Sequence, residues 1–190
     1  MSANTGMLQA FVELRAEDVE ATSAHEVAHA RLAAGARLQA LRRVRVFELT
    51  GTLPDAQAAK ALLHRSTRFY NPAKERCTVR MSASEAAPFD RDESLVLVLD
   101  RGLERRPAAE RWWRHETGHK VEVREGLAWA LRFEPGVDAA RESESLAAVE
   151  DRATGLLCNP HFQDWRPGSG GSPPWPWLTA PEQGAKGRNA

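Results

Sequence analysis

The stretch Leu95-Val96-Leu97-Val98-Leu99 decides the fold class, because five consecutive apolar residues rich in valine predict a strand buried on both faces. Such a strand lies in the interior of a sheet. Residues 107–118 then predict a helix, since Pro107 suits its first turn and Gly118 its end. Residues 127–133 alternate between apolar and small or charged side chains, which predicts a second strand.

A second helix and a last strand are predicted downstream. Ser143 or Ser145 can cap this helix, and Asn159-Pro160 ends it, because proline disfavours helical geometry at the preceding residue. Its expected apolar stripe is Leu146, Val149, Ala153, Leu156 and Leu157. A short strand at 162–166 completes the order strand, helix, strand, helix, strand.

The first half of the chain has the same order of elements. Strands are predicted at residues 8–14, 44–49 and 77–81. One helix is expected to start with Ser23 as its N-cap and to end at Gly35. For another helix, Thr52 and Asp55 bracket the expected cap, Pro54 is expected in the first turn, and Asn71-Pro72 is the expected end.

Landmarks recur between the halves after roughly 83 to 88 residues, as in Arg15 and Arg101, Gly35 and Gly118, and Asn71 and Asn159. The predicted fold class is therefore α+β, with two tandem strand-helix-strand-helix repeats of ferredoxin-like order and antiparallel sheets. The alternative is two different lobes that share an element order.

Four regions follow from this pattern. The first repeat is expected at 7–81, a polar linker at 82–94, the second repeat at 95–166 and a flexible tail at 167–190, which is rich in Pro, Gly and Ser. Trp175, Trp177 and Leu178 in the tail could instead dock on the body of the protein or on a partner.

Composition excludes some classes of partner. The 190 residues have a formal net charge of zero, which gives no electrostatic reason to expect nucleic acid or an acidic membrane. Cys77 and Cys158 are far apart and outside any CxxC pair, so reduced structural thiols are expected rather than a disulfide. No signal peptide or membrane segment is apparent, so the expected location is cytoplasmic.

Two segments fit the H-E-x-x-H pattern of zinc hydrolases, in which two histidines one helical turn apart bind the metal and the glutamate polarises a water molecule. They are His25-Glu26-Val27-Ala28-His29 and His115-Glu116-Thr117-Gly118-His119. If Ser23 is the N-cap, His25 falls in the first turn of its helix, and if Gly118 ends the other helix, His119 falls outside it. No third ligand is obvious, and His64 and His161 are uncommitted. The sequence therefore predicts no catalytic, cofactor-binding or metal-binding residues.

Two segments of the second half have a family resemblance. They are Lys120–Phe133 (KVEVREGLAWALRF) and Ala153–Trp165 (ATGLLCNPHFQDW), which ends a helix in Leu-Leu-x-Asn-Pro. Both resemble segments of the small PurS subunit of phosphoribosylformylglycinamidine synthase, and the first half carries a weaker version of the pattern. The family usually has Gly-Lys where this chain has Arg124-Glu125-Gly126, and its members are about half as long.

The resemblance implies a tandem, covalently joined PurS-like dimer with a role in purine biosynthesis. A PurS subunit carries no catalytic residues. It bridges the glutaminase and ATP-dependent synthetase subunits, so that ammonia released at one active site reaches the other. Such a bridge would bind its partners through a few aromatic and arginine side chains. Trp112, Trp113 and Trp129 are candidates, because adjacent tryptophans on a helix are not expected to point into one core.

Three functions are thus open at the level of sequence. The first is a non-catalytic bridging subunit with no nucleic-acid or membrane partner, with self-association as a further option. The second is a zinc-dependent hydrolase that uses residues 25–29. The third is a regulatory module that binds a small molecule between its repeats.

Overall fold

The computed structural model describes residues 4–179, which form an α+β fold with one six-stranded antiparallel sheet and four α-helices. The strands are β1 (Asn4–Leu14), β2 (Leu38–Leu53), β3 (Glu75–Arg80), β4 (Ser94–Asp100), β5 (Val121–Phe133) and β6 (Gln163–Ser169). The helices are α1 (Val19–Arg31), α2 (Ala56–His64), α3 (Pro107–Thr117) and α4 (Ala139–Ala147), and a short 3-10 turn, η1 (Ala34–Arg37), precedes β2.

The sheet has the strand order β3-β1-β2-β5-β4-β6. The long strands β2 and β5 pair antiparallel at its centre, so that strands of the first half lie on one side and strands of the second half on the other. One row of paired residues crosses the whole sheet through Cys77, Val12, Arg45, Leu127, Val98 and Trp165. A single sheet therefore joins both halves of the chain.

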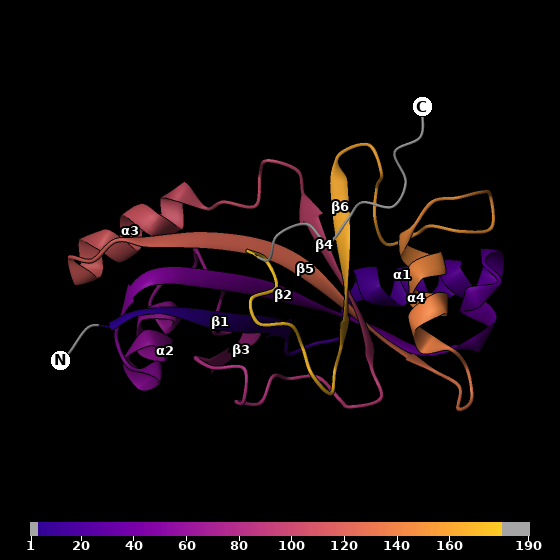
Figure 1. Ribbon diagram of the computed structural model, residues 1–190, viewed down its shortest axis with the longest axis horizontal. Coiled ribbons are helices and arrows are strands. Elements are labelled where there is room, and N and C mark those ends of the chain that lie inside the picture. The colour runs from indigo at the N-terminus through magenta and orange to yellow at the C-terminus, as the bar shows by residue number, and fades with distance from the viewer. Residues whose placement is uncertain (1–3, 180–190) are drawn as a thin grey trace.

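All four helices cover the same face of the sheet, in two pairs at opposite ends (Figure 1). The helices α2 and α3 share a core with Phe47, Val121 and Val123. The helices α1 and α4 share a second core with Trp129 and Leu131 on the same face. Each pair combines a helix from the first half with one from the second, so neither half has a core of its own on this face.

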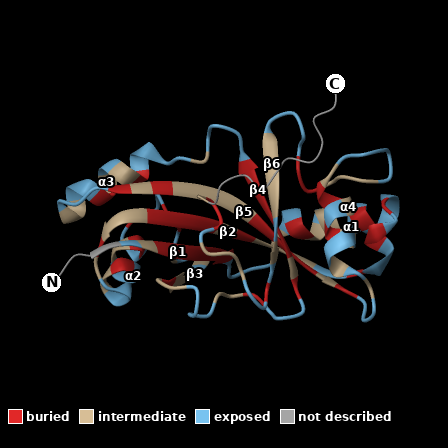
Figure 2. Ribbon diagram, viewed as in Figure 1, coloured by how far each residue is buried: buried red, intermediate tan, exposed pale blue. Residues whose placement is uncertain are grey.

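The opposite face of the sheet has a third core without helices. The even-numbered residues of β5, Ala128 and Ala130, lie here because successive side chains of a strand point to opposite faces. Two irregular segments cover this core. One supplies Phe89, and the other supplies Trp177 and Leu178. Figure 2 shows the buried residues concentrated in the central strands.

Each predicted strand is present, but the strands differ in length from the prediction. The buried strand at 95–99 is confirmed as β4, in which Leu95 to Leu99 are all at most 4% exposed. The strands predicted at 44–49 and 127–133 are the middle and end of longer strands, because β2 and β5 hydrogen-bond to each other along most of their length. The cross-strand partners thus extend strands beyond their apolar runs.

The predicted start and end of the first helix are wrong. Asp18, not Ser23, is the N-cap, and its Oδ1 accepts hydrogen bonds from the backbone N–H groups of Glu20 and Ala21 at 3.1 and 3.3 Å. A tertiary ion pair with Arg43 of β2 holds Asp18 in place. The helix ends before Gly35, and that glycine is needed for close packing, since a Cβ there would lie 2.0 Å from the carbonyl oxygen of Ala28.

The two helices predicted to end at Asn-Pro are shorter than expected. Asp55 is the N-cap of α2, so Pro54 precedes the helix and the prediction that it lies in the first turn is wrong. This helix ends at His64, and Phe69 and Tyr70 are buried from an irregular segment. Neither Ser143 nor Ser145 caps α4, because Asp138 is its N-cap.

The Asn-Pro sites are instead tight turns that lead into edge strands, and the two turns have the same hydrogen bonds. Asn71 Oδ1 accepts from Ala73 N at 3.1 Å, and Asn159 Oδ1 accepts from His161 N at 3.0 Å. The backbone oxygens of both asparagines also accept from the residue four positions on, at 2.8 Å in each turn. These turns place the first residues of β3 and β6.

The segment predicted as a linker, 82–94, contains no helix or strand before Ser94. It nevertheless packs on the protein, since Phe89 and Glu93 are 9% and 5% exposed. No helix within residues 4–179 has the length and apolar character needed to cross a membrane.

Candidate functional site

Residues 167–179 of the predicted flexible tail are an ordered part of the fold, so that prediction is wrong for them. Pro167 to Ser169 belong to β6, and Ser172–Thr179 form an irregular segment, here called the strap, across the sheet face opposite the helices. Trp177 and Leu178 are each 1% exposed. Docking of these side chains on the body of the protein, the alternative considered from sequence, is confirmed. The remaining tail residues, 180–190, lie outside the described residues.

Three buried polar side chains lie beneath one part of the strap, and together they are called the polar triad. They are Gln9, Glu48 and Arg80, which are 0%, 1% and 1% exposed. Gln9 of β1 lies between the other two in the sheet, opposite Glu48 of β2 and Arg80 of β3. Arg80 Nε donates to Gln9 Oε1 at 2.7 Å, and Gln9 Nε2 donates to Glu48 Oε1 at 2.5 Å.

The polar triad binds the backbone of the strap at both ends. Glu48 Oε1 accepts from Trp177 N at 2.5 Å, and Glu48 Oε2 accepts from Thr179 N at 2.9 Å and Thr179 Oγ1 at 3.1 Å. Arg80 Nη2 donates to the carbonyl oxygens of Pro173 and Pro174 at 3.1 and 2.9 Å. Since proline keeps its carbonyl but has no N–H, a donor such as arginine suits this part of the strap.

Aromatic rings complete the surroundings of Arg80. Its guanidinium lies over the rings of Phe11 and Trp175, at 5.5 and 5.2 Å from their centroids. Burial lowers the pKa of Arg80, and the charge of Glu48 acts in the opposite direction. The hydrogen bonds and rings thus compensate a buried cation.

A small apolar area receives the side chains of the strap. Gly168, Leu95 and Ala130 form a row across β6, β4 and β5. A Cβ on Gly168 would lie 3.0 Å from the Trp177 ring, and a Cβ on Gly126 would lie 2.7 Å from Leu178. Both glycines therefore leave the room that the two strap side chains occupy. The polar triad and this apolar area together are called the strap-binding surface.

A second polar cluster lies beside the strap-binding surface. Arg42 binds Glu13 at 2.6 Å and Glu93 at 2.7 Å, and it donates to the carbonyl oxygen of Pro88 at 2.6 Å. Burial lowers the pKa of Arg42, but the hydrogen bond and charge of Glu93 and the charge of Glu13 outweigh it and raise the pKa overall. Arg42 thus holds the segment before β4 against the sheet. A neighbouring hollow of about 210 Å³ is lined by this cluster and the start of α1.

The structure changes the interpretation of the first H-E-x-x-H match. His25 and His29 both lie within α1, so the argument from a Ser23 cap is wrong. Their Nε2 atoms are 3.2 and 2.8 Å from the carbonyl oxygen of Leu38, which can only accept, so each Nε2 carries the proton. Both histidines thereby tie α1 to the start of β2.

The second match is split by the end of α3. Gly118 is its C-cap with φ of 73°, so His119 lies outside the helix as predicted. Within residues 4–179, no three His, Cys, Asp or Glu side chains gather in a way that could hold a metal ion.

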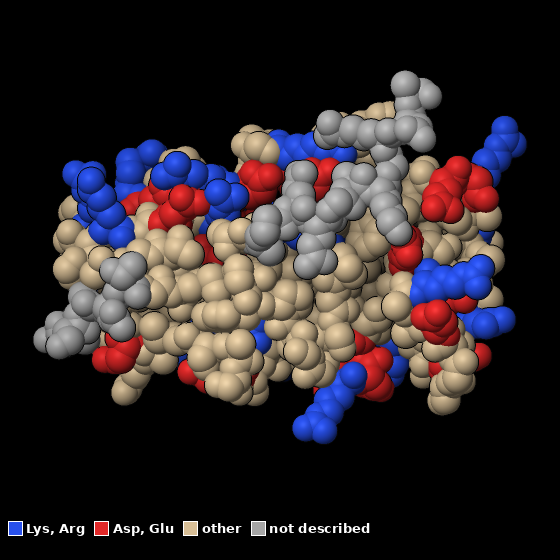
Figure 3. Space-filling view, viewed as in Figure 1, with Lys and Arg blue, Asp and Glu red and all other residues tan. Residues whose placement is uncertain are grey.

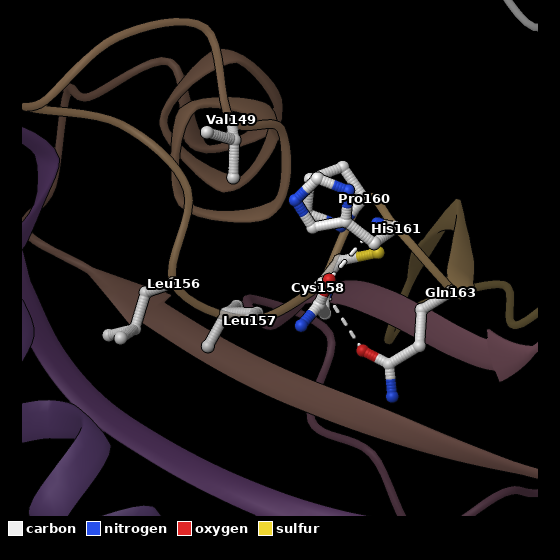
Figure 4. Close-up of a pocket in the computed structure, with 8 residues that line it drawn as sticks. Val149, Leu156, Leu157, Cys158, Pro160, His161 and Gln163 are labelled. Atoms are coloured by element: carbon white, nitrogen blue, oxygen red, sulfur yellow. Dashed lines mark hydrogen bonds between the residues drawn. The ribbon is translucent and has the colours of Figure 1, made fainter.

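A shallow hollow lies after α4 (Figure 4). It has a volume of about 390 Å³, and Val149, Leu157, Cys158 and His161 are among its lining residues. Burial raises the pKa of the Cys158 thiol to about 11, which keeps it protonated and unreactive at neutral pH. Cys158 and Cys77 are both free and buried, which confirms the prediction that they form no disulfide.

The three tryptophans proposed as partner contacts belong to the helix-side cores. Trp113 and Trp129 are 0% and 8% exposed. Trp112 and Trp113 both pack edge-on against Phe69, with centroid distances of 5.8 and 6.4 Å. The prediction that adjacent tryptophans could not share a core is wrong. Phe69 comes from the first half, however, so both rings do contact the other half of the chain.

Sequence reasoning missed the polar triad altogether. Its only signal was a polar residue inside an apolar strand, such as Glu48 in VRVFEL. That signal does not reveal which distant groups the side chain binds. No protein-family model, no curated protein and no solved structure matches this chain significantly.

Proposed function

We propose that this chain is a non-catalytic accessory subunit of a phosphoribosylformylglycinamidine synthase complex, built as a tandem duplication of a PurS-like unit. In this role it bridges the glutaminase and ATP-dependent synthetase subunits for transfer of ammonia. The observation that carries the proposal is the matched register of the two halves. Leu14 pairs with Glu75 across β1 and β3, and Asp100 pairs with Gln163 across β4 and β6.

The matching Asn-Pro turns support the duplication. Just beside each turn, a backbone bond closes the strand pair, from Arg15 N to Lys74 O and from Arg101 N to Phe162 O, both at 2.9 Å. Arginine, asparagine and proline therefore recur in both halves, and the backbone bonds of the arginines and the turn bonds of the asparagines are the same. A chance similarity of element order would not require equal bonds.

The arrangement of the halves supports a fused dimer. Two separate subunits related by a two-fold axis would pair identical strands at their interface. Here the equivalent strands β2 and β5 pair with each other at the centre of the sheet. The exchange of helices between the two cores, with Trp113 packed on Phe69, would likewise be the interface of such a dimer.

The two ends of the molecule differ in charge, which suits a bridge between two unlike partners. The connections that carry α2 and α3, residues 54–74 and 101–120, hold ten basic and four acidic side chains: Lys60, Arg65, Arg68, Lys74, Arg101, Arg105, Arg106, Arg111, Arg114 and Lys120 against Asp55, Glu104, Glu110 and Glu116. The basic side chains gather over α3 in Figure 3.

The connections that carry α1 and α4, residues 15–37 and 134–162, have the opposite balance. They hold five basic and ten acidic side chains: Arg15, Arg31, Arg37, Arg141 and Arg152 against Glu17, Asp18, Glu20, Glu26, Glu134, Asp138, Glu142, Glu144, Glu150 and Asp151. A dimer of identical subunits has two identical ends. Fusion of the two units lets each end evolve toward its own partner.

The deciding experiment is synthesis of formylglycinamidine ribonucleotide by the glutaminase and synthetase subunits of the same organism, with and without this chain. We expect activity with glutamine to require the chain, and activity with free ammonia to be independent of it. Equal activity with glutamine in both assays would refute the bridging role.

A further inference from the structure

The strap has the contacts of a bound peptide rather than those of a further strand. One isolated bridge, between Ser169 and Ser172, is its only β pairing within the described residues. Side chains of the sheet bind its backbone, and its own side chains enter an apolar area. From these contacts we infer that the strap-binding surface is a peptide-binding site that accepts the strap of a second copy of this chain, so that two copies exchange straps.

The binding groups all belong to the sheet and do not depend on the strap for their positions. Gln9, Glu48 and Arg80 lie on three adjacent strands and bind one another. Gly126 lies on the central strand β5. The surface is therefore preorganised, which lowers the free-energy cost of binding a peptide.

The connection between sheet and strap is suited to a change of direction. Gly168, Gly170 and Gly171 lie within four residues at the end of β6, and glycine adopts backbone conformations that other residues rarely reach. Past this connection, the one backbone–backbone hydrogen bond of the strap within the described residues joins Ser172 N to Ser169 O. Exchange of an identical element between two protomers can form the same docking contacts between chains and is a low-cost route to a dimer.

The second copy is the occupant that the structure supports, because its strap has the required chemistry at each position. Pro173 and Pro174 present carbonyl oxygens to Arg80, Trp177 and Thr179 present N–H groups to Glu48, and Leu178 fits over Gly126. This inference goes beyond the proposed accessory role and does not depend on it.

The test uses two full-length variants that are each defective on one side of the contact. Trp177→Ala weakens the strap and leaves the strap-binding surface intact. Glu48→Gln weakens the surface and leaves the strap intact, since an amide has one acceptor oxygen and both oxygens of Glu48 accept hydrogen bonds from the strap. Phe162→Ala, at a side chain that is 53% exposed, serves as the control.

Sedimentation velocity then measures the mass of the wild type and of each variant in solution. We expect the wild type and Phe162→Ala to form dimers as concentration rises, from a chain of 21.0 kDa, and each defective variant to dimerise less. Mixing the two variants should restore a heterodimer, because the intact strap of one fits the intact surface of the other. A mixture that stays at single-chain mass, with both variants unfolding cooperatively, overturns the inference.

A labelled synthetic peptide with the sequence of residues 172–179 provides a second measurement that does not require stable variants. We expect it to dissociate wild-type dimers, and to bind Trp177→Ala at least about tenfold more tightly than the wild type, whose own strap competes. Peptide binding without any dimer would overturn the second copy as occupant. If the peptide does not bind at all, the strap-binding surface is not a peptide site.

Discussion

Arg45 lies directly opposite Leu127 at the centre of the sheet, and the row through them continues to Val12 on one side and Val98 on the other. The same row ends at Cys77 in β3 and Trp165 in β6, so each half of the chain contributes three strands to it. The pair of Arg45 and Leu127 therefore marks the boundary between the two halves of the sheet. Residues at matching positions on either side of this pair can be compared by mutation.

Equivalent turns should contribute equally to stability. Replacing Asn71 or Asn159 by alanine removes one side-chain acceptor from a matched turn, so each change should lower the free energy of unfolding by about 1 kcal/mol. Urea denaturation measures both values. The Asp variants keep the acceptor and should be nearly neutral, and a large difference between the two alanine variants would contradict the equivalence of the turns.

Adjacent tryptophans should differ in their contribution to the core. Trp113→Ala should lower the free energy of unfolding by roughly 3–5 kcal/mol, because the side chain is fully buried between the two halves. Trp112→Ala should cost less, since that ring is only partly buried. Thermal or urea unfolding of both variants measures the two losses of stability. Equal losses would show that burial of the ring does not determine the contribution of each tryptophan.

Charge reversal should separate the two ends of the proposed bridge. Arg111→Glu with Arg114→Glu changes α3, and Glu142→Lys with Glu144→Lys changes α4. None of these four residues has an ion pair within the described residues, so the fold should tolerate each double change. The affinity of each double variant for the glutaminase subunit and for the synthetase subunit is then measured separately.

Each pair of changes should weaken one partner only, and the effect should shrink at high salt, because exposed charges are screened. Loss of both partners by one pair of changes would argue against two distinct docking ends.

The histidines of α1 should act through Leu38 rather than through a metal. His29→Ala removes a hydrogen bond of 2.8 Å and should lower the free energy of unfolding by about 1 kcal/mol, whereas His29→Gln keeps a donor and should lose less. Glu26→Gln should have no effect, since Glu26 is exposed. Stoichiometric zinc in the purified protein, lost in His29→Ala, would revive the hydrolase hypothesis.

The two thiols should be protected until the protein unfolds. Burial raises the pKa of Cys77 to about 12 and that of Cys158 to about 11. Both groups therefore favour the folded state below the pKa of an unfolded thiol, about 8.5, and this contribution falls as pH rises toward the folded values. Alkylation at pH 8 followed by mass spectrometry should be slow without denaturant and complete with it. Fast alkylation of the folded protein would show that the two thiols are not buried.

Local sequence was sufficient for features that depend on neighbouring residues. The apolar run at 95–99 identified the interior strand, because a strand buried on both faces must be apolar throughout. Gly118 identified the end of α3, because a C-cap position with positive φ favours glycine. Thr52, Pro54 and Asp55 located the start of α2 only to within a few residues, because Asp55 itself is the N-cap and its side chain accepts a hydrogen bond from Ala58 N.

Features that depend on distant residues could not be predicted in this way. Asp18 caps α1 and is held by an ion pair with Arg43 of β2. The strap is ordered because Glu48 and Arg80 bind its backbone. The strap is rich in proline and follows a glycine-rich connection, and this composition is typical of a flexible segment.

By itself the sequence determined the kinds of elements and their repeated order, since hydrophobic period, caps and breakers act over a few residues. Only the tertiary structure decided that β2 pairs with β5, that each helix pair mixes the two halves, and that Gln9, Glu48 and Arg80 meet the strap. The physical reason is that these contacts join residues far apart in the chain. A buried polar group is stable only where such distant partners complete its hydrogen bonds.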